Sequence, residues 1–254
     1  MKIRVLSDLH LEFYDDPYPA GIFDDIDCDV VVLAGDIHSG LQGIEWAADT
    51  FSTPVIYVMG NHEYYGRDAD VLLARARKRA AELGVHLLEK DEITIAGTRF
   101  LGCTLWSDFE GGGRSQLDNV HAAQSVLADF KAIVKDGALL TPSTMIDWFT
   151  EAKDWLGQKL ESEIPAVVVT HFAPSWQVVN PKFGVEDANT AYFNNNLEEL
   201  MGNAVPVWIF GHHHWSMSKT IETPNGKTLV TANQLGYPRE ETNFQADYVI
   251  STPS

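Results

Sequence analysis

Five short apolar runs, each ending abruptly in a polar residue, constrain the fold of this chain more than any other feature of its sequence. The runs are rich in Val, Ile and Leu, which is typical of strands buried on both faces of a largely parallel sheet. They occupy residues 3–6, 30–34, 55–59, 166–169 and 205–210. In open α/β sheets the carboxyl ends of parallel strands meet along one edge, where ligands bind. The sequence therefore predicts an α/β fold with a functional site at that edge.

Helical and turn patterns between the runs predict the remaining elements. Helices are expected over residues 42–51, 68–83, 118–134 and 145–160. Gly84 would end the second of these helices, and Pro142 suits the first turn of the last. Residues 92–103 and 217–232 instead predict hairpins, because strand-like runs flank turn residues there.

The chain has 254 residues, a length that allows one large domain or two small ones. No segment is dense enough in Pro, Gly or Ser to act as a linker, so we expect residues 1–254 to form a single domain, with a mainly helical insertion at about 106–163. No apolar run approaches the roughly 20 residues of a membrane span, and no signal peptide is recognisable. Only two cysteines occur, Cys28 and Cys103. These features predict a cytoplasmic protein with free thiols and no membrane contact.

The polar residues at the ends of the runs are of types that bind metal ions. They are Asp8, His10, Asp36, Asn61, His62, His171, His212 and His214. Carboxylate, amide and imidazole donors without a thiolate suit Mn²⁺, Fe or Zn²⁺. The set exceeds the ligands of one tetrahedral site and fits two ions if a carboxylate bridges them, an arrangement that recurs in displacement at phosphorus. Because residues i and i+2 of an extended chain point to the same side, we expect each of the pairs Asp8/His10 and His212/His214 to reach one centre.

In sequence order these blocks resemble the calcineurin-like metallophosphoesterases. The matching blocks are Asp8-x-His10, Gly35-Asp36, Gly60-Asn61-His62-Glu63, His171 and Gly211-His212-x-His214. Each block alone is weak, whereas the ordered set over residues 8–214 is highly specific. The serine/threonine phosphatases of this superfamily continue the second block with an Asp-Arg pair that is missing here. The chain therefore looks closer to the bacterial phosphodiesterase-like members.

The resemblance implies a fold, a ligand set and a mechanism. The fold would be a four-layer α/β/β/α sandwich of two mixed β-sheets flanked by helices. The ligands of one metal would be Asp8, His10 and His214, and those of the other would be Asn61, His171 and His212, with Asp36 bridging the two ions. Hydroxide held between the ions would attack phosphorus, and His62 would protonate the leaving oxygen as general acid.

Three further residues are candidates for contact with the substrate: His38, Arg114 and Tyr64. They stand in segments near the expected site, where loops commonly carry specificity. Glu63 would either brace the block around His62 or lie in solvent, and the sequence leaves both interpretations open.

The acidic composition narrows the substrate class. The chain carries 36 Asp and Glu against 18 Lys and Arg, a formal net charge of −18, whereas nucleic acids and anionic membranes require a basic face. We therefore expect a small or medium-sized phosphoester substrate, with a phosphodiester favoured. A phosphomonoesterase or protein phosphatase is the alternative among enzymes, and a non-catalytic interaction scaffold with this fold is the alternative from another class. The sequence leaves the identity of the metals and the oligomeric state open.

Overall fold

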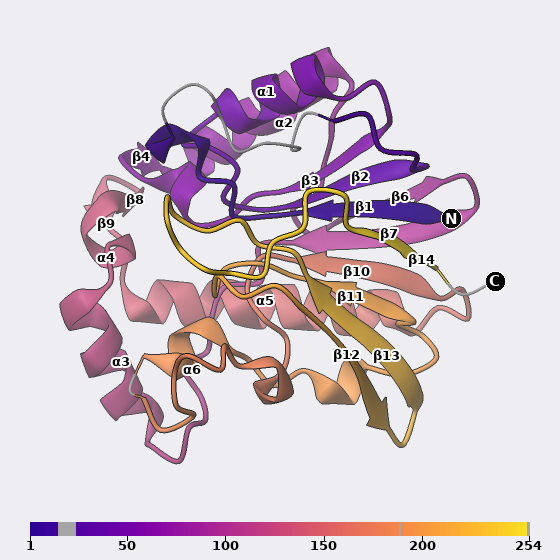
Figure 1. Cartoon of the computed structure of the whole chain (residues 1–254). Coiled ribbons are helices and arrows are strands. Elements are labelled where there is room, and N and C mark those ends of the chain that lie inside the picture. The colour runs from indigo at the N-terminus through magenta and orange to yellow at the C-terminus, as the bar shows by residue number, and fades with distance from the viewer. Residues whose placement is uncertain (15–23, 188, 253–254) are drawn as a thin grey trace.

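The computed structural model describes residues 1–14, 24–187 and 189–252, and its strands form two large mixed sheets and a small one (Figure 1). In order across the first sheet, the strands are β14 (Val249–Ser251), β1 (Lys2–Leu6), β2 (Val30–Ala34), β3 (Val55–Val58) and β5 (His86–Leu87). Across the second sheet they are β12 (Met217–Thr223), β13 (Gly226–Ala232), β11 (Val207–Ile209), β10 (Ala166–Thr170), β7 (Thr98–Cys103) and β6 (Asp91–Ile95). The five predicted apolar runs form β1, β2, β3, β10 and β11.

Strand direction brings the carboxyl ends of these five strands to one edge of each sheet. β1, β2 and β3 are parallel neighbours, and β10 is parallel to β11. The edge strand β5 is parallel to β3, whereas the other outer pairings of the two large sheets are antiparallel: β14 pairs with β1, β12 with β13 and β6 with β7. The last two pairs are the hairpins predicted over residues 217–232 and 92–103, and both are confirmed.

Apolar side chains fill the space between the two large sheets. Val5 of the first sheet and Phe100 of the second belong to one cluster there, and neither is accessible to water. Successive side chains of a strand point to opposite faces, so the alternate residues face outward, where helices cover them. α1 (Gln42–Thr50) and α2 (Ala69–Leu83) cover the first sheet, and α5 (Pro142–Leu160) covers the second (Figure 1). The expected four-layer α/β/β/α sandwich is confirmed.

Helices α1, α2 and α5 begin and end close to their predicted positions. At the start of α2 the Asp68 carboxylate accepts a hydrogen bond from the backbone N–H of Val71, and Gly84 ends the helix in the left-handed conformation, with φ 75°. Thr141 caps α5, and Pro142 stands in its first turn. In the part of the chain that the structure describes, no helix is both long and apolar enough to cross a membrane.

The helix expected over residues 118–134 is wrong in its second half. α3 (Gln116–Val126) stops at Leu127, which has an extended backbone, and only one further turn follows, α4 (Asp129–Ala132). The chain then enters the small third sheet, which consists of β4 (Arg67–Asp68), β8 (Ile133–Lys135) and β9 (Ala138–Leu139). Pairing of β8 with the distant β4 overrides the local helical pattern, and the β-branched Ile133 and Val134 favour the extended form. Whether residues 106–163 are an insertion stays a prediction.

Two glycines, one at a helix end and one inside a helix, test these helix boundaries. We expect Gly84→Ala to lower the free energy of unfolding by about 1–2 kcal/mol, because a Cβ disfavours the left-handed conformation. Gly157 lies inside α5 with open space around a Cβ, so Gly157→Ala should raise the same free energy by about 0.5–1 kcal/mol. Urea denaturation of both variants measures the two changes, and equal signs would contradict the assigned helix boundary.

Candidate metal centre

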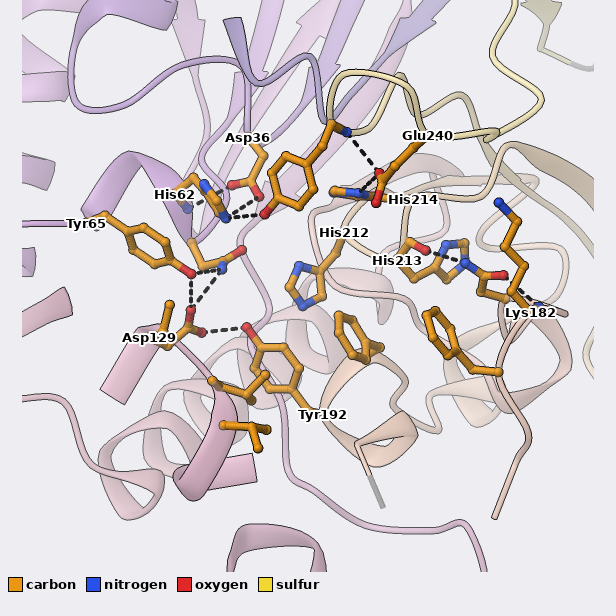
Figure 2. A pocket seen from close by; sticks show the side chains of 18 residues that line it. Asp36, His62, Tyr65, Asp129, Lys182, Tyr192, His212, His213, His214 and Glu240 are labelled. Carbon is orange, nitrogen blue, oxygen red and sulfur yellow. Dashed lines mark hydrogen bonds and ion pairs between the residues drawn. The ribbon is translucent and has the colours of Figure 1, made fainter. Parts of the chain in front are cut away.

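The polar residues at the strand ends of both sheets meet at one cavity of about 340 Å³ (Figure 2). Five of the eight predicted residues line it: Asp36, Asn61, His62, His212 and His214. The other three, Asp8, His10 and His171, are fully buried directly behind them. The structure thus brings together every residue that the five runs placed at their polar ends.

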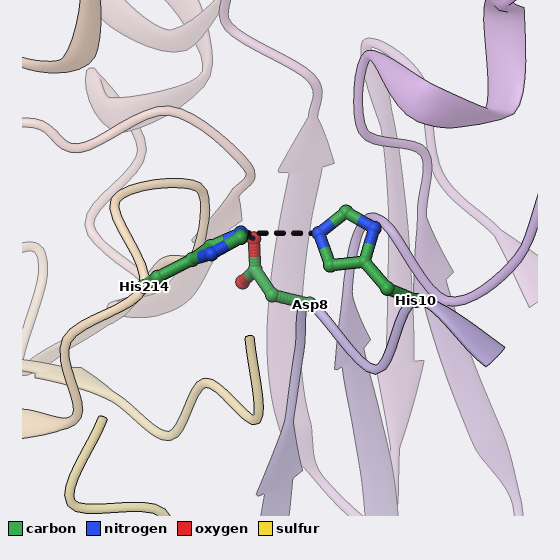
Figure 3. Close-up of side chains that lie close together, drawn as sticks. All are labelled: Asp8, His10 and His214. Atoms are coloured by element: carbon green, nitrogen blue, oxygen red, sulfur yellow. Dashed lines mark hydrogen bonds and ion pairs between the residues drawn. The ribbon is translucent and has the colours of Figure 1, made fainter. Parts of the chain in front are cut away.

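Asp8, His10 and His214 form a first group of candidate ligands (Figure 3). Nε2 of His10 lies 3.0 Å from Nε2 of His214, and Oδ1 of Asp8 lies 3.6 Å from the latter. Nδ1 of His214 is 2.6 Å from the Glu240 carboxylate. A proton on Nδ1 is therefore held by Glu240, which leaves the Nε2 lone pair facing the group, as a metal-binding imidazole requires.

Asp36, His171 and His212 form a second group, to which Asn61 is adjacent. Nε2 of His171 lies 3.4 Å from Oδ2 of Asp36 and 3.1 Å from Oδ1 of Asn61. The Asn61 amide is oriented by Asp129, which accepts a hydrogen bond of 2.9 Å from its nitrogen. Its oxygen therefore points toward His171.

The donors of the second group are arranged for a cation rather than for one another. Nδ1 of His171 is 2.8 Å from the carbonyl oxygen of Ala34, a contact that places its proton on Nδ1. In the neutral imidazole, Nε2 then faces the Asn61 oxygen with a lone pair, and a positive ion between the two atoms makes this contact favourable. Nε2 of His212 is buried and has no hydrogen-bond partner among the described residues, and such an atom is costly without a ligand. The residues present fit a bound metal ion.

Asp36 stands between the two groups. Its Oδ2 is 3.4 Å from Nε2 of His171 and 3.7 Å from Nε2 of His10. Its Oδ1 accepts a hydrogen bond of 2.8 Å from the backbone N–H of His62. One carboxylate thus links the first group, the second group and the segment that carries His62.

The expectation that each i, i+2 pair reaches one centre is wrong for one pair. Asp8 and His10 belong to the same group, whereas His212 and His214 belong to different groups. None of the four is extended, because their φ angles lie between 44° and 78°. The chain turns sharply just beyond the strand end, so the two-residue periodicity of a strand no longer applies there.

His62 lies at the mouth of the centre beside two carboxylates and a tyrosine. Its Nε2 is 3.0 Å from the Tyr237 hydroxyl and its Nδ1 is 3.5 Å from Oε1 of Glu12. Burial lowers the pKa of His62, but the charges of Asp36 and Glu12 raise it to about 9. Burial likewise opposes ionisation of Glu12, yet contacts with His10 and His62 lower its pKa to about 2. Glu12 is therefore a carboxylate partner of His62.

Glu63 braces the turns that carry Asp36 and His62. It is fully buried, and its carboxylate accepts hydrogen bonds from the backbone N–H groups of Asp36, Ile37 and Gly60 and from the Tyr57 hydroxyl. Burial and the nearby Asp36 carboxylate raise the pKa of Glu63. Of the two interpretations of Glu63, the brace is confirmed and the solvated position is wrong.

Two motif glycines allow the loops to approach the ligands. A Cβ on Gly35, whose φ is 90°, would lie 2.3 Å from Nδ1 of His171, and one on Gly60 would lie 2.1 Å from Oδ1 of Asp36. Neither position has room for a side chain, because these ligands occupy the space that a Cβ needs.

The sequence profile of a family described as calcineurin-like phosphoesterase matches residues 1–216. The chain belongs to the calcineurin-like phosphoesterase family. It is accordingly a phosphoric ester hydrolase of a family that depends on divalent metal ions. The buried donors described above are the candidate metal ligands of this family member.

Two similar proteins extend the comparison over almost the whole chain. An uncharacterized protein of Acanthamoeba polyphaga mimivirus is 28% identical over 272 residues, which cover 95% of this chain and 93% of that protein. The crystal structure of a phosphopantetheinyl hydrolase from Mycobacterium tuberculosis matches with a TM-score of 0.71 at 20% identity, and the match covers 94% of this chain and 90% of that one. The second likeness shows a shared fold.

The three residues expected to face the substrate of this phosphoesterase are not among those that line the described cavity. Tyr64 is buried and packs on Trp106, while the adjacent Tyr65 lines the cavity instead. His38 lies 3.9 Å from Glu12, outside the lining. Arg114 is exposed, and its backbone bridges to Gly111 in a turn. Contact of Tyr64, His38 and Arg114 with a substrate therefore stays a prediction.

Four residues that support the phosphoesterase centre were not predicted from the sequence: Glu12, Asp129, Tyr237 and Glu240. Asp129 is buried and accepts hydrogen bonds from Asn61, Tyr65 and Tyr192, and burial raises its pKa. Glu12 could have been predicted as a candidate, because it stands two residues after His10 and so directly follows the first block. The other three lie in segments without any motif.

The brace formed by Glu63 is testable by stability. We expect Glu63→Gln to lower the free energy of unfolding by about 1–3 kcal/mol, because the new amide group would face backbone donors with a donor of its own. Tyr57→Phe removes a single hydrogen bond and should cost about 1 kcal/mol. Urea denaturation of the metal-free protein measures both, with the exposed Glu163→Gln as control. An unchanged stability of Glu63→Gln would refute the brace.

Proposed function

We propose that this phosphoesterase is a dinuclear enzyme that hydrolyses a phosphodiester. The observation that carries the dinuclear assignment is the position of Asp36, whose Oδ2 lies within 3.7 Å of an imidazole nitrogen of each ligand group. A carboxylate placed in this way suits the bridge between two ions that phosphoryl-transfer sites use.

The residues divide into two ligand sets around that bridge. Asp8, His10 and His214 would hold one ion. His171, His212 and Asn61 would hold the other. This oxygen and nitrogen donor set suits Mn²⁺, Fe²⁺ or Zn²⁺. When bound, such ions supply a water of lowered pKa as nucleophile and stabilise the negative charge on the phosphoryl oxygens.

His62 would act as the general acid. Its imidazole is not one of the proposed metal ligands, but it lines the cavity beside them, so it can reach an ester oxygen of a bound substrate. Glu12 and Tyr237 hold its two ring nitrogens from opposite sides, at 3.5 Å and 3.0 Å. A positioned acid of this kind contributes 10²–10⁴-fold to the rate.

The charge of the cavity supports a diester over a monoester. A phosphodiester carries one negative charge and a monoester carries up to two at neutral pH. Among the lining residues the single ammonium group is that of Lys182, which already donates a hydrogen bond to the carbonyl oxygen of Glu241. Apart from the metal centre and the His62 imidazole, the lining therefore offers no spare cation for a second phosphate charge.

A reducing compartment such as the cytoplasm suits the protein. Cys28 and Cys103 are free cysteines, and burial raises the pKa of both thiols. Thiols of this kind persist where glutathione and thioredoxin keep them reduced.

Metal stoichiometry tests the dinuclear proposal. Chelated protein titrated with Mn²⁺ should bind two ions per chain, measured by elemental analysis after dialysis. His10→Ala and His171→Ala should each retain one ion, because each removes a ligand from a different group. Binding of a single ion by the unmodified chain would contradict the bridge by Asp36.

Turnover after replacement of His62 tests its role. We expect His62→Ala to keep its metal content while the hydrolysis rate falls by about 10²–10⁴-fold, because the leaving oxygen loses its proton donor. The assay compares a chromogenic diester with the matching monoester after reconstitution with Mn²⁺, Zn²⁺ or Fe²⁺.

The control is His121→Ala, since His121 is exposed on α3 and outside the cavity lining. It should leave both metal content and turnover unchanged. Full activity of His62→Ala would refute the general acid, preference for the monoester would refute the diester assignment, and hydrolysis of neither ester would favour a scaffold.

A further inference from the structure

The cavity that holds the candidate metal centre has a second half that the proposed chemistry does not use. This half, the apolar wall, consists of Val126 at the end of α3, Leu127 and Ala128 between α3 and α4, and the aromatic residues Phe183 and Phe193. Phe193 ends α6 (Thr190–Phe193), and its ring centroid lies 4.9 Å from that of His212. The wall therefore starts directly at a candidate metal ligand and runs outward to the mouth of the cavity.

The outer part of the apolar wall is exposed to solvent. Val126 is 58% exposed and Phe183 is 53% exposed, while Leu127 and Phe193 are partly buried. A group of exposed apolar side chains next to a concave, partly polar site is typical of a ligand-binding surface, whereas isolated exposed apolar residues are common on any protein. Covering these side chains with an apolar group would remove them from water and favour binding.

The apolar wall carries no free charge. Lys182, next to Phe183, lies 5.4 Å from the Trp215 ring centroid and donates its hydrogen bond to Glu241. The lining carboxylates of Asp129 and Glu240 already accept hydrogen bonds, from Tyr192 and from His214 respectively. A ligand group that lies along the wall needs no charge of its own, and a second phosphate would find no partner.

We propose that the apolar wall binds the organic part of the phosphoester, and that this part is an elongated, uncharged apolar chain. The inference rests on the proposed function, because the phosphoryl group must be anchored at the candidate metal centre for its substituent to reach the wall. The aliphatic side chains of the α3–α4 turn and the aromatic rings of Phe183 and Phe193 line the same cavity as the candidate ligands, so a chain that leaves the centre can lie against them.

The test is the affinity of the metal-loaded protein for n-alkylphosphonates of two to eight carbons, measured by isothermal titration calorimetry. These compounds keep the phosphoryl anchor and cannot be hydrolysed, so the readout is independent of turnover. Affinity should rise about three- to fourfold for each methylene that the wall covers. The double variant Val126→Ser with Phe183→Ser should flatten this dependence while the affinity for ethylphosphonate stays the same.

Val71→Ser is the matched control, because Val71 is also 58% exposed but lies on α2, away from the cavity. It should retain the full chain-length dependence. Equal affinity for all chain lengths, or a dependence that survives in the double variant, would overturn the apolar wall as a binding surface. A chain-length dependence in a protein that hydrolyses no phosphoester would support the wall and refute the proposed function.

Discussion

In the candidate metal centre, imidazole nitrogens and carboxylate oxygens lie close together, and their lone pairs and negative charges repel one another. The surrounding structure keeps these side chains in place despite that repulsion. Five of the candidate ligands have φ angles between 44° and 78°: Asp8, His10, Asp36, His212 and His214. Such a conformation costs on the order of 1–3 kcal/mol for each non-glycine residue. At Asp36 it persists because the Glu63 carboxylate ties that turn to Gly60. At Asp8 and His212 it persists because the Asp8 carboxylate accepts a hydrogen bond from the backbone N–H of His212. A cation would relieve the repulsion without further movement of the chain.

Local pattern was enough to predict the strand ends and the polar residues that meet there. Each strand is marked by a short run of apolar residues, and the polar residues of its block follow directly in the sequence. Both signals lie within about ten residues of each other. Helix α2 was predictable for the same reason, because Asp68 and Gly84 stand next to the segment they terminate. Glu63 was correctly considered as a brace because it belongs to the block it supports.

The residues that sequence reasoning missed act across long distances. Asp129 orients Asn61 from a helix that is 68 positions away, and Glu240 holds His214 from a loop 26 positions away. No periodicity connects such pairs, since only the packing of the sheets brings them together. The same limit explains the error over residues 118–134, where pairing with β4 decides the conformation. It also explains why Tyr65 rather than Tyr64 lines the cavity, because a 3₁₀ turn at His62–Tyr64 rotates the two side chains apart.

The charge at the candidate metal centre would differ in sign from the net charge of the chain, which is −18. Two divalent ions would bring four positive charges to a centre whose ligands include two carboxylates, Asp8 and Asp36, so the centre would be positive within a negative body. A phosphoryl group is attracted there, whereas the rest of the surface repels large polyanions.

The pairing of His10 with His214 across 204 positions has a consequence for the synthesis of the chain. At about 5–20 residues per second, a ribosome needs roughly 10–40 s to make the intervening segment. Throughout that interval the first block is present without the imidazole that completes its group. A metal ion can acquire the full set of ligands only after the strand ends of both sheets have come together.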